Sequence, residues 1–270
     1  DSGNALTGRI ALSYTMADDT LVYASYNRGY RAGAVNGGGY TSSAGISFIE
    51  PERVNAYEVG IKGRAMDGRL TLAASAFYYD YSNQQLQDTR TGAVSFLVNA
   101  PASKVYGYET EATFRPMPGM RLTGSLGLLH SEYSELTLQA TDLSGNRLPF
   151  APKMTAQLGM EWDMAQLGGG TITFAPTMAY SSQQYFSPFN AENVVGSPQV
   201  NSELQQGANA KVNVGLSWSN DVITVRAFAN NLFERETYGY GLDLRGAGFP
   251  YNFLVPTMPR TYGVSVRFGF

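Results

Sequence analysis

The sequence predicts an all-β protein, a transmembrane antiparallel β-barrel to which this chain contributes roughly eleven strands. Apolar and polar residues alternate with a period of two along most of the chain, which is the pattern of strands whose two faces meet different surroundings. Only 15% of the residues are charged, whereas soluble domains average about 25%. Much of the surface must therefore be something other than a charged skin facing water.

The composition excludes several classes of protein. The chain has 270 residues, a formal net charge of −3 and no Cys, so it has neither the clustered basic surplus of a nucleic-acid binder nor thiols for disulfides, zinc or nucleophilic catalysis. No stretch approaches the roughly 18 apolar residues of a membrane helix. Because residues 1–4 show neither an initiating Met nor a signal sequence, we expect a mature chain or a fragment.

Residues 154–163, 210–219 and 261–270 show the alternation most clearly, with one apolar face and one polar, small or charged face. A soluble antiparallel sandwich or propeller would bury the apolar face, whereas a membrane barrel turns it to lipid and the polar face to a lumen. We favour the barrel, because these segments run about ten residues, as tilted membrane strands do. Aromatic residues typical of interfacial girdles stand at the segment ends: Trp162, Trp218, Tyr262 and Phe270.

The connections between strands alternate between short and long, as periplasmic turns and extracellular loops do in outer-membrane barrels. The short ones, rich in Gly, Pro, Asn and Asp, lie at 17–19, 66–68, 117–119, 166–169 and 220–221. The long ones lie at about 31–52, 88–95, 134–149, 184–206 and 233–259. The strands between them are centred near residues 10, 25, 58, 76, 107, 126, 157, 177, 213, 227 and 265.

An odd number of strands has a consequence for the barrel. Single-chain bacterial barrels have an even number, and eleven antiparallel strands leave the first and last unable to pair antiparallel with each other. An unpaired strand edge in lipid costs several kcal/mol per backbone group. We therefore expect the C-terminal part of a larger barrel, with Asp1 in an extracellular loop; a small even-stranded barrel is the alternative.

Several segments together resemble TonB-dependent outer-membrane receptors. Residues 49–62, IEPERVNAYEVGIK, resemble the family's "PE…YE.G.K" strand, and 99–111 with GYETE resembles a later one. Further matches, in the family's order, are 26–33, 72–84, Asn230-Asn231-Leu232-Phe233 and the terminal strand 260–270. The resemblance implies a 22-stranded barrel with an N-terminal plug domain and a TonB box. Residues 1–270 would supply its last eleven strands or so, with neither plug nor box.

The long loops carry the candidate ligand contacts. Aromatic faces and Arg side chains on adaptable loops suit a flat, polar or anionic ligand. Alternatively, these aromatics form the outer girdle or pack loop against loop. The candidates are Arg31, Tyr40, Tyr185, Phe186, Phe189, Tyr240, Arg245, Phe249 and Tyr251.

The polar strand faces carry the candidate contacts to a plug or lumen. The alternative, which we favour for these residues, is a lattice of opposite charges on neighbouring strands. The set consists of Glu58, Lys62, Glu109, Glu111, Glu161, Lys211, Arg226 and Arg267.

No catalytic, metal or cofactor site is predicted. His130 is the single His, and in a strand the adjacent Ser131 faces the opposite way, so these two, beside Glu132, do not form a nucleophile–base pair. No His cluster suits a transition metal. Glu109 and Glu111 resemble a hydrolase pair only in residue type. Phe270 resembles the terminal aromatic that barrel-assembly machinery reads.

The resemblance implies TonB-dependent uptake of a scarce large nutrient across the outer membrane of a Gram-negative bacterium, with a ferric siderophore as the preferred cargo. Implied partners are the remaining strands and plug, the TonB–ExbB–ExbD complex, outer-membrane lipid and lipopolysaccharide, and the small-molecule nutrient, but no nucleic acid. The alternatives are a passive porin-type channel, a receptor for cobalamin, a glycan or another organic nutrient, and a soluble β-protein for adhesion.

Overall fold

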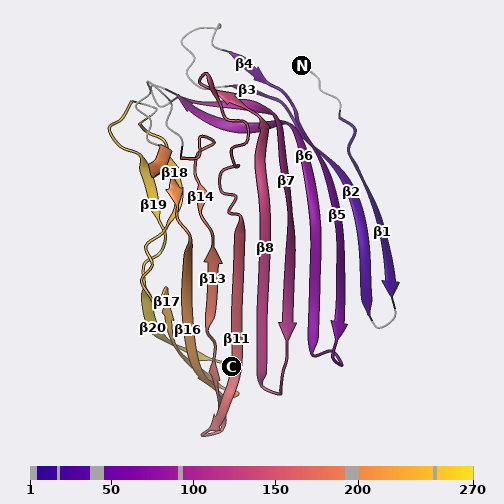
Figure 1. Cartoon of the computed structure of the whole chain (residues 1–270). Helices are drawn as coiled ribbons and strands as arrows, with labels where there is room; N and C mark the ends of the chain where they lie inside the picture. The colour runs from indigo at the N-terminus through magenta and orange to yellow at the C-terminus, as the bar shows by residue number, and fades with distance from the viewer. Residues whose placement is uncertain are drawn as a thin grey trace.

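A computed structural model describes residues 5–16, 19–36, 46–90, 94–191, 201–245 and 248–269. These residues form one large antiparallel sheet that curves into an open trough (Figure 1). Its strands, in spatial order, are β1 (Gly8–Met16), β2 (Thr20–Arg31), β5 (Glu52–Ala65), β6 (Leu70–Arg90), β7 (Val94–Phe114), β8 (Met120–Glu135), β11 (Met154–Leu167), β12 (Gly170–Phe174), β16 (Asn209–Ser219), β17 (Ile223–Asn230) and β20 (Thr261–Phe268). Among the described residues the one helical turn is a 3₁₀ segment at Asn201–Glu203, and no described segment forms a helix long and apolar enough to cross a membrane.

A proline divides one of these strands in two. β12 and β13 (Thr177–Ser181) pair with the same neighbours, β11 and β16, on either side of Pro176. Ala175 and Gly215 exchange both backbone hydrogen bonds across the break, at 2.8 and 3.1 Å. A proline lacks the N–H that a strand inside a sheet donates, so the strand is interrupted at Pro176. Both pieces still pair with the same two neighbouring strands. The two pieces count as one strand, and the predicted eleven strands are confirmed.

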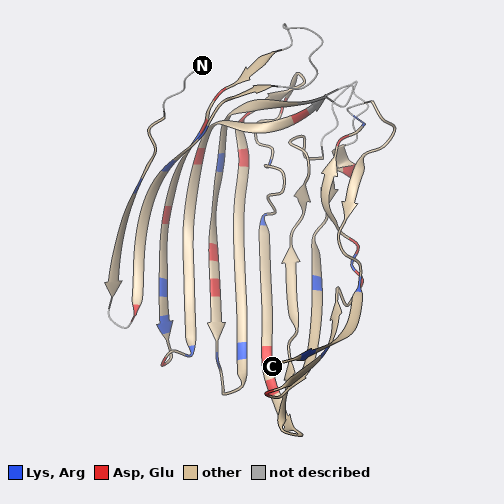
Figure 2. Cartoon of the chain, turned by 180° about the vertical axis from the view of Figure 1, so that it is seen from behind, with Lys and Arg blue, Asp and Glu red and all other residues tan. Residues whose placement is uncertain are grey.

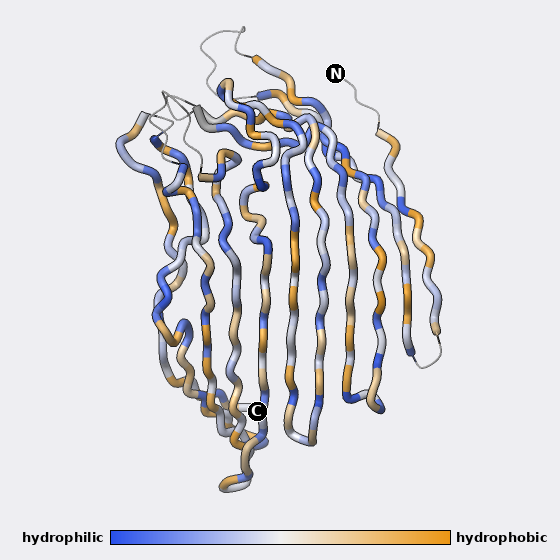
Figure 3. Tube along the Cα trace, in the orientation of Figure 1, coloured by the Kyte–Doolittle hydropathy of each residue, from blue (hydrophilic) through white to orange (hydrophobic). Residues whose placement is uncertain are grey.

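The two faces of the sheet differ as the alternation predicts, and Figure 3 shows apolar and polar residues alternating along the strands. We call the outward face the one that carries Ile10, Val59, Leu158, Leu216 and Val264. On this face no Asp, Glu, Lys or Arg stands between the turn ends of the strands and a row of aromatic rings described below.

No second layer covers the outward face within the described residues. Tyr262 is 81% exposed and Val264 is 69% exposed, although both are large and apolar. In water, burying such a row stabilises a sheet by about 25 cal/mol per Å², so a soluble sandwich would not leave it bare. The predicted sandwich alternative is therefore wrong for this sheet.

Short turns join the strands at one end of the sheet and long connections join them at the other. At Met66, Asp67 and Gly68 three consecutive residues have positive φ, between 55° and 80°, which makes a tight turn. The long connections fold into small hairpins: β3–β4 (Ala34–Asn36, Ser47–Ile49), β9–β10 (Thr137–Leu138, Thr141–Asp142), β14–β15 (Gln184–Tyr185, Gln205–Gln206) and β18–β19 (Tyr238–Leu242, Phe253–Pro256).

One predicted loop is wrong. Residues 88–95 were expected to be a long connection, but β6 and β7 stay paired as far as Arg90 and Val94. Both strands are 21 residues long, so their paired ends extend well beyond their neighbours. In Figure 1 these ends bend across the loop end of the sheet, where Leu86 and Val98 pack against loop residues.

The hydrophobic cluster of the described chain lies at this loop end, not within the sheet. Ala100 on β7 and Tyr133 on β8 pack with loop residues Leu136, Leu143 and Phe189, and all five are nearly inaccessible. Leu86 on β6 and Val98 on β7 are partly buried and pack against this cluster. The loops therefore have their own packed core and do not hang free from the strands.

Gly107 tests how tightly β7 and β8 approach. A Cβ atom added at Gly107 would stand 2.2 Å from the carbonyl oxygen of Leu128 and 2.9 Å from the ring of Phe77. We expect Gly107→Ala to destabilise the intact protein by about 1–3 kcal/mol, because backbone must shift to relieve the overlap. Gly124→Ala is the control, since its Cβ would meet Leu158 at an ordinary 3.5 Å. The temperature at which the folded, fast-migrating gel band disappears measures both; equal temperatures would contradict the prediction.

Candidate functional site

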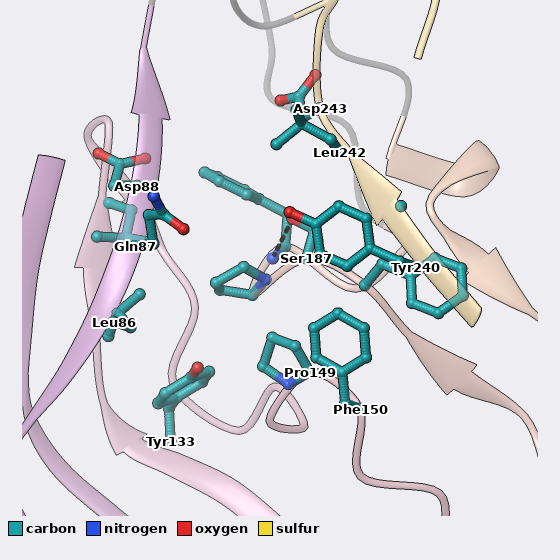
Figure 4. A pocket seen from close by; sticks show the side chains of 15 residues that line it. Leu86, Gln87, Asp88, Tyr133, Pro149, Phe150, Ser187, Tyr240, Leu242 and Asp243 are labelled. Atoms are coloured by element: carbon teal, nitrogen blue, oxygen red, sulfur yellow. Dashed lines mark hydrogen bonds between the residues drawn. The ribbon is translucent and has the colours of Figure 1, made fainter. Parts of the chain in front are cut away.

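A cavity of about 210 Å³ opens at the loop end of the sheet (Figure 4). It is built by segments that are distant in sequence: the top of β6, the top of β8, the loop before β11, the residues after β14, and strand β18. Its lining consists of Leu86, Gln87, Asp88, Tyr133, Leu138, Pro149, Phe150, Phe186, Ser187, Pro188, Phe189, Tyr240, Gly241, Leu242 and Asp243. In Figure 4, Phe150 and Tyr240 stand on one side and Leu86, Gln87 and Asp88 on the other.

Two aromatic rings present accessible faces to this cavity. Phe150 and Tyr240 stack with centroids 5.9 Å apart and planes only 6° from parallel, and they are 46% and 41% exposed. Phe186 supports Phe150 from behind, at 5.5 Å. Phe150 has a positive φ of 58°, a strained backbone for a bulky residue that tertiary contacts must hold. A flat, rigid aromatic wall of this kind suits a planar or apolar part of a ligand.

Phe150 was missed by the sequence reasoning, which ended the preceding loop at residue 149. The available signal was an aromatic residue directly after a proline at a loop-to-strand boundary, where backbone strain often marks function.

The predicted ligand residues Phe186 and Phe189 lie deeper than a primary contact would. Phe186 is 7% exposed and Phe189 is 3% exposed, and Phe189 belongs to the hydrophobic cluster. Both rings line the cavity but expose little area to it, so they support its shape. Tyr185 has a different environment, because the guanidinium of Arg147 lies 4.6 Å from its ring centroid in a cation–π contact. The sequence reasoning did not predict this contact.

Arg245, another predicted ligand residue, is engaged by a neighbouring loop. Its Nε and Nη2 donate to the two carboxylate oxygens of Glu203, at 3.1 and 3.3 Å. Asn252 also donates to Glu203, at 3.1 Å, and accepts from the backbone N–H groups of Leu244 and Arg245. A bidentate Arg–carboxylate pair neutralises both partners, so Arg245 ties the 201–206 segment to the β18–β19 hairpin.

The other loop candidates that the structure describes, Arg31, Phe249 and Tyr251, do not line the cavity. Phe249 and Tyr251 contact each other with ring centroids 6.1 Å apart and are exposed. Arg31 is exposed at the end of β2, opposite Glu52 on β5. Tyr40 and Phe270 lie outside the described residues.

In the same loop end, two hydrogen bonds from Ser144, one from its side chain and one from its backbone, hold the pKa of Asp142 below its usual value. The backbone bond is 2.9 Å long. Asp142 is thus charged near neutral pH and shapes its own hairpin as an Asx turn.

The strand register places all eight predicted lumen residues on one face of the sheet, opposite the outward face; we call it the inward face. A single row of paired residues runs from Lys62 through Ala73, Glu111, Ser125, Gln157 and Ala179 to Lys211. Glu58, Glu109 and Glu161 lie an even number of residues from members of that row, which keeps them on the same face. Arg226 pairs with Ser217 and Ser265, and Arg267 with Thr224, which extends the face to the last strand.

The favoured lattice of opposite charges is not what this face contains. Among the described residues of the set, one ion pair is formed, between Glu161 and Arg121. Glu58 instead accepts a hydrogen bond from the hydroxyl of Tyr23, and the Nζ of Lys62 lies 5.7 Å from the centroid of the same ring. Lys211 donates to Thr257. The other four members of the set, Glu109, Glu111, Arg226 and Arg267, form no ion pair within the described residues.

His130 belongs to a row of rings on the outward face. Tyr26, Tyr57, Tyr78, Tyr106 and His130 are direct partners on five successive strands, with centroids 4.6–6.5 Å apart. The row stands about eight residues above the turns, or roughly 20 Å of height for tilted strands, close to the apolar band of a membrane barrel. His130 also lies 3.1 Å from Glu132. It is an interfacial residue, and no group of three or more potential metal ligands occurs among the described residues.

Comparison with known proteins identifies the fold's family. The family model described as "TonB dependent receptor-like, beta-barrel" matches residues 1–232. The chain belongs to the TonB-dependent receptor β-barrel family. Barrels of this family are outer-membrane proteins of Gram-negative bacteria, so the bare outward face of the sheet is the face that meets lipid.

Individual relatives agree with this assignment. The chain is 28% identical to the pesticin receptor of Yersinia enterocolitica over 97% of its own length and 36% of that protein. The crystal structure of the ferric yersiniabactin uptake receptor FyuA from Yersinia pestis superposes with a TM-score of 0.75 at 23% identity, covering 98% of this chain and 37% of that one. BauA, the ferric preacinetobactin receptor from Acinetobacter baumannii, superposes at 0.70 and 23% identity, covering 97% and 36%. The chain thus spans little more than a third of these TonB-dependent receptors.

The pairing of Arg245 with Glu203 can be tested by proteolysis. We expect Glu203→Gln to speed trypsin cleavage after Arg245 by about two- to fivefold in the intact receptor, since a partly exposed pair contributes about 0.2–1 kcal/mol. Glu234→Gln is the matched control, because it breaks the exposed Arg260–Glu234 pair, 2.8 Å, and leaves Arg245 untouched. Cleavage at the wild-type rate in Glu203→Gln would show that the pair does not hold these loops together.

Proposed function

We propose that this chain is the C-terminal part of the barrel of a TonB-dependent receptor that takes up a scarce, large nutrient, with a ferric siderophore as the preferred cargo. The family match carries the proposal. The names of the relatives support the cargo, since they include a pesticin receptor and receptors for ferric yersiniabactin and ferric preacinetobactin. No chemical reaction is part of this proposal: the protein would bind and move its cargo unchanged.

The edges of the sheet support the idea that residues 1–270 are part of a larger barrel. Among the described residues β1 pairs only with β2, and β20 only with β17. An odd number of antiparallel strands points β1 and β20 the same way, so they cannot close on each other in antiparallel fashion. In lipid each open edge would leave unpaired backbone groups that cost several kcal/mol apiece. Further strands on both sides would remove that cost.

The inward face supports the presence of a plug, because most of its charged residues do not form ion pairs with one another. In this proposal the plug fills the lumen against residues such as Glu109, Glu111 and Arg226, and the TonB–ExbB–ExbD complex supplies the energy that moves it. Outer-membrane lipid and lipopolysaccharide lie against the outward face.

The cargo would bind first at the loop end, over the wall formed by Phe150 and Tyr240. The cavity of about 210 Å³ is smaller than the roughly 300–1,000 Å³ of typical small-molecule sites. The remaining barrel and the plug would complete it. Tyr185 with its Arg147 neighbour offers a cation beside an aromatic face, and Arg31, Phe249 and Tyr251 offer outer contacts.

The contribution of the aromatic wall can be measured by cargo binding. We expect Phe150→Ala or Tyr240→Ala to weaken binding of the ferric complex by about two- to tenfold, because an aromatic contact contributes about 0.5–1.5 kcal/mol. Phe253→Ala is the control, since it removes an exposed ring from the same hairpin outside the cavity lining. Equal affinity in all variants would remove this cavity from the cargo site.

Energy coupling separates active uptake from the alternative of a passive porin. Cells that carry the full receptor should accumulate radioactive iron from a ferric siderophore under iron limitation, and should lose that uptake when TonB is deleted. Uptake that persists without TonB would favour the porin. TonB-dependent growth on cobalamin or a glycan, without iron uptake, would favour those cargoes instead.

A further inference from the structure

We propose that the turn end of the inward face holds an acidic peptide segment of the plug, through a row of arginines at the turn ends of β6, β7 and β8: Arg69, Arg115 and Arg121. This deepens the proposed function and rests on it, because it requires a plugged barrel. These three arginines are not among the residues that the sequence reasoning assigned to the lumen.

The arginines are neighbours across strands. The N–H of Arg115 donates to the carbonyl of Arg69 at 2.8 Å, and Arg115 and Arg121 stand one residue beyond the Phe114–Leu122 pair. Arg121 is the direct partner of Glu161 on β11. On β5, Arg64 pairs with Thr71, two residues from Arg69, so it joins the row diagonally.

All of these cations lie on the inward side. Glu161 and Arg121 share the face of the Lys62–Lys211 row by register, and Arg69, Arg115 and Arg121 line one cavity of about 480 Å³ together with Glu161 and Asp163. Figure 2 shows the basic segments gathered at the turn ends of these strands, with acidic segments at mid-height on β7. The outward face of the described strands has no charged residue near the turn ends, so these arginines do not face lipid headgroups.

The turn end carries more positive than negative charge: Lys62, Arg64, Arg69, Arg115 and Arg121 stand against Asp67, Glu161 and Asp163. Side chains directly opposite on neighbouring strands have Cβ atoms about 5 Å apart, and like charges in that position destabilise a sheet. Glu161 is already paired with Arg121, and Asp163 accepts a hydrogen bond from Thr173 at 2.7 Å. Arg64, Arg69, Arg115 and Lys62 are all exposed. An anionic partner placed against the row would relieve the repulsion.

A peptide carboxylate is the partner that the place and shape favour. The cavity lies at the end of the barrel opposite the loops, where cargo does not first arrive, and prolines and Met117 line it beside the charges. Guanidinium groups in a row match a run of Asp or Glu side chains through paired N–H···O contacts. A cargo that passes through, or a free phosphate, would contact these arginines only transiently and would not require a row of them.

Carbodiimide coupling in outer membranes that carry the full receptor tests the proposal directly. Arg115→Lys keeps the charge and supplies an amine that condenses with a nearby carboxylate to an amide. We expect peptide mass spectrometry to find this amine joined to Asp or Glu outside residues 1–270. Arg28→Lys, on the outward face of β2, is the control and should give no such link. Coupling of position 115 only to Glu161 or Asp163, or not at all, would overturn the proposal.

Conductance gives a second reading. Arg69→Gln combined with Arg115→Gln should raise the basal conductance of the receptor in planar bilayers several-fold and lower the urea concentration that opens the channel, because the plug is held less firmly. Unchanged conductance in a variant that keeps its heat-resistant folded band would count against the proposal. If the double variant fails to fold, the Arg115→Lys coupling decides alone.

The two proposals fail separately. Loss of ferric-complex binding with the cross-link present would overturn the iron cargo and leave the arginine row intact. Normal ferric-complex binding with no cross-link outside residues 1–270 would overturn the arginine row and leave the proposed uptake function standing.

Discussion

Backbone hydrogen bonding in an apolar solvent is the constraint on which the rest of this structure depends. Hydrocarbon offers no partner for a free N–H or C=O, so each strand must pair with its neighbours along its whole membrane-spanning length. The ladder of paired strands meets that requirement from β1 to β20, even across Pro176, where Ala175 and Gly215 keep both bonds. The same register that satisfies the backbone also separates the side chains into a polar inward face and an outward face that is uncharged between the turn ends and the aromatic row. Stability of the sheet comes from this pairing and from lipid, because no second layer packs on it.

Packing in the familiar sense begins only where the strands leave the membrane. The tall ends of β6 and β7 rise beyond the row of tyrosines and become one side of a small hydrophobic cluster that includes Tyr133 and Phe189. That cluster holds the loops at fixed positions, and the aromatic wall of Phe150 and Tyr240 is built on it. The residues proposed to contact a ligand and the residues that make the wall rigid are therefore different, although both groups are aromatic.

The inward face follows another principle. Its carboxylates and cations contact tyrosine and threonine more often than one another, as Glu58 does with Tyr23 and Lys211 does with Thr257. The acidic residues at mid-height on β7 lie apart from most of the basic residues at the turn end, where Glu161 pairs with Arg121. A face with unspent and segregated charge is suited to a partner of complementary charge, whereas a lattice of internal pairs would only stiffen the wall. Between the turn ends and the aromatic row the described outward face has no charged residues, so the two faces are suited to different partners.

Sequence alone determined the features that depend on local alternation. The number of strands, the identity of the lipid-facing rows and the common face of residues such as Glu58 and Lys211 all follow from a period of two, which is visible within ten residues. Features that depend on register between distant segments came only with the tertiary structure. Phe189 is part of the hydrophobic cluster because the residues after β14 fold onto Ala100 of β7 and Tyr133 of β8. Arg245 pairs with Glu203 because two loops more than 40 residues apart in sequence pack together. Likewise, the row of Arg69, Arg115 and Arg121 exists only once β6, β7 and β8 stand in register. Alternation tells which way a side chain points, but which side chains become neighbours is decided by non-local pairing.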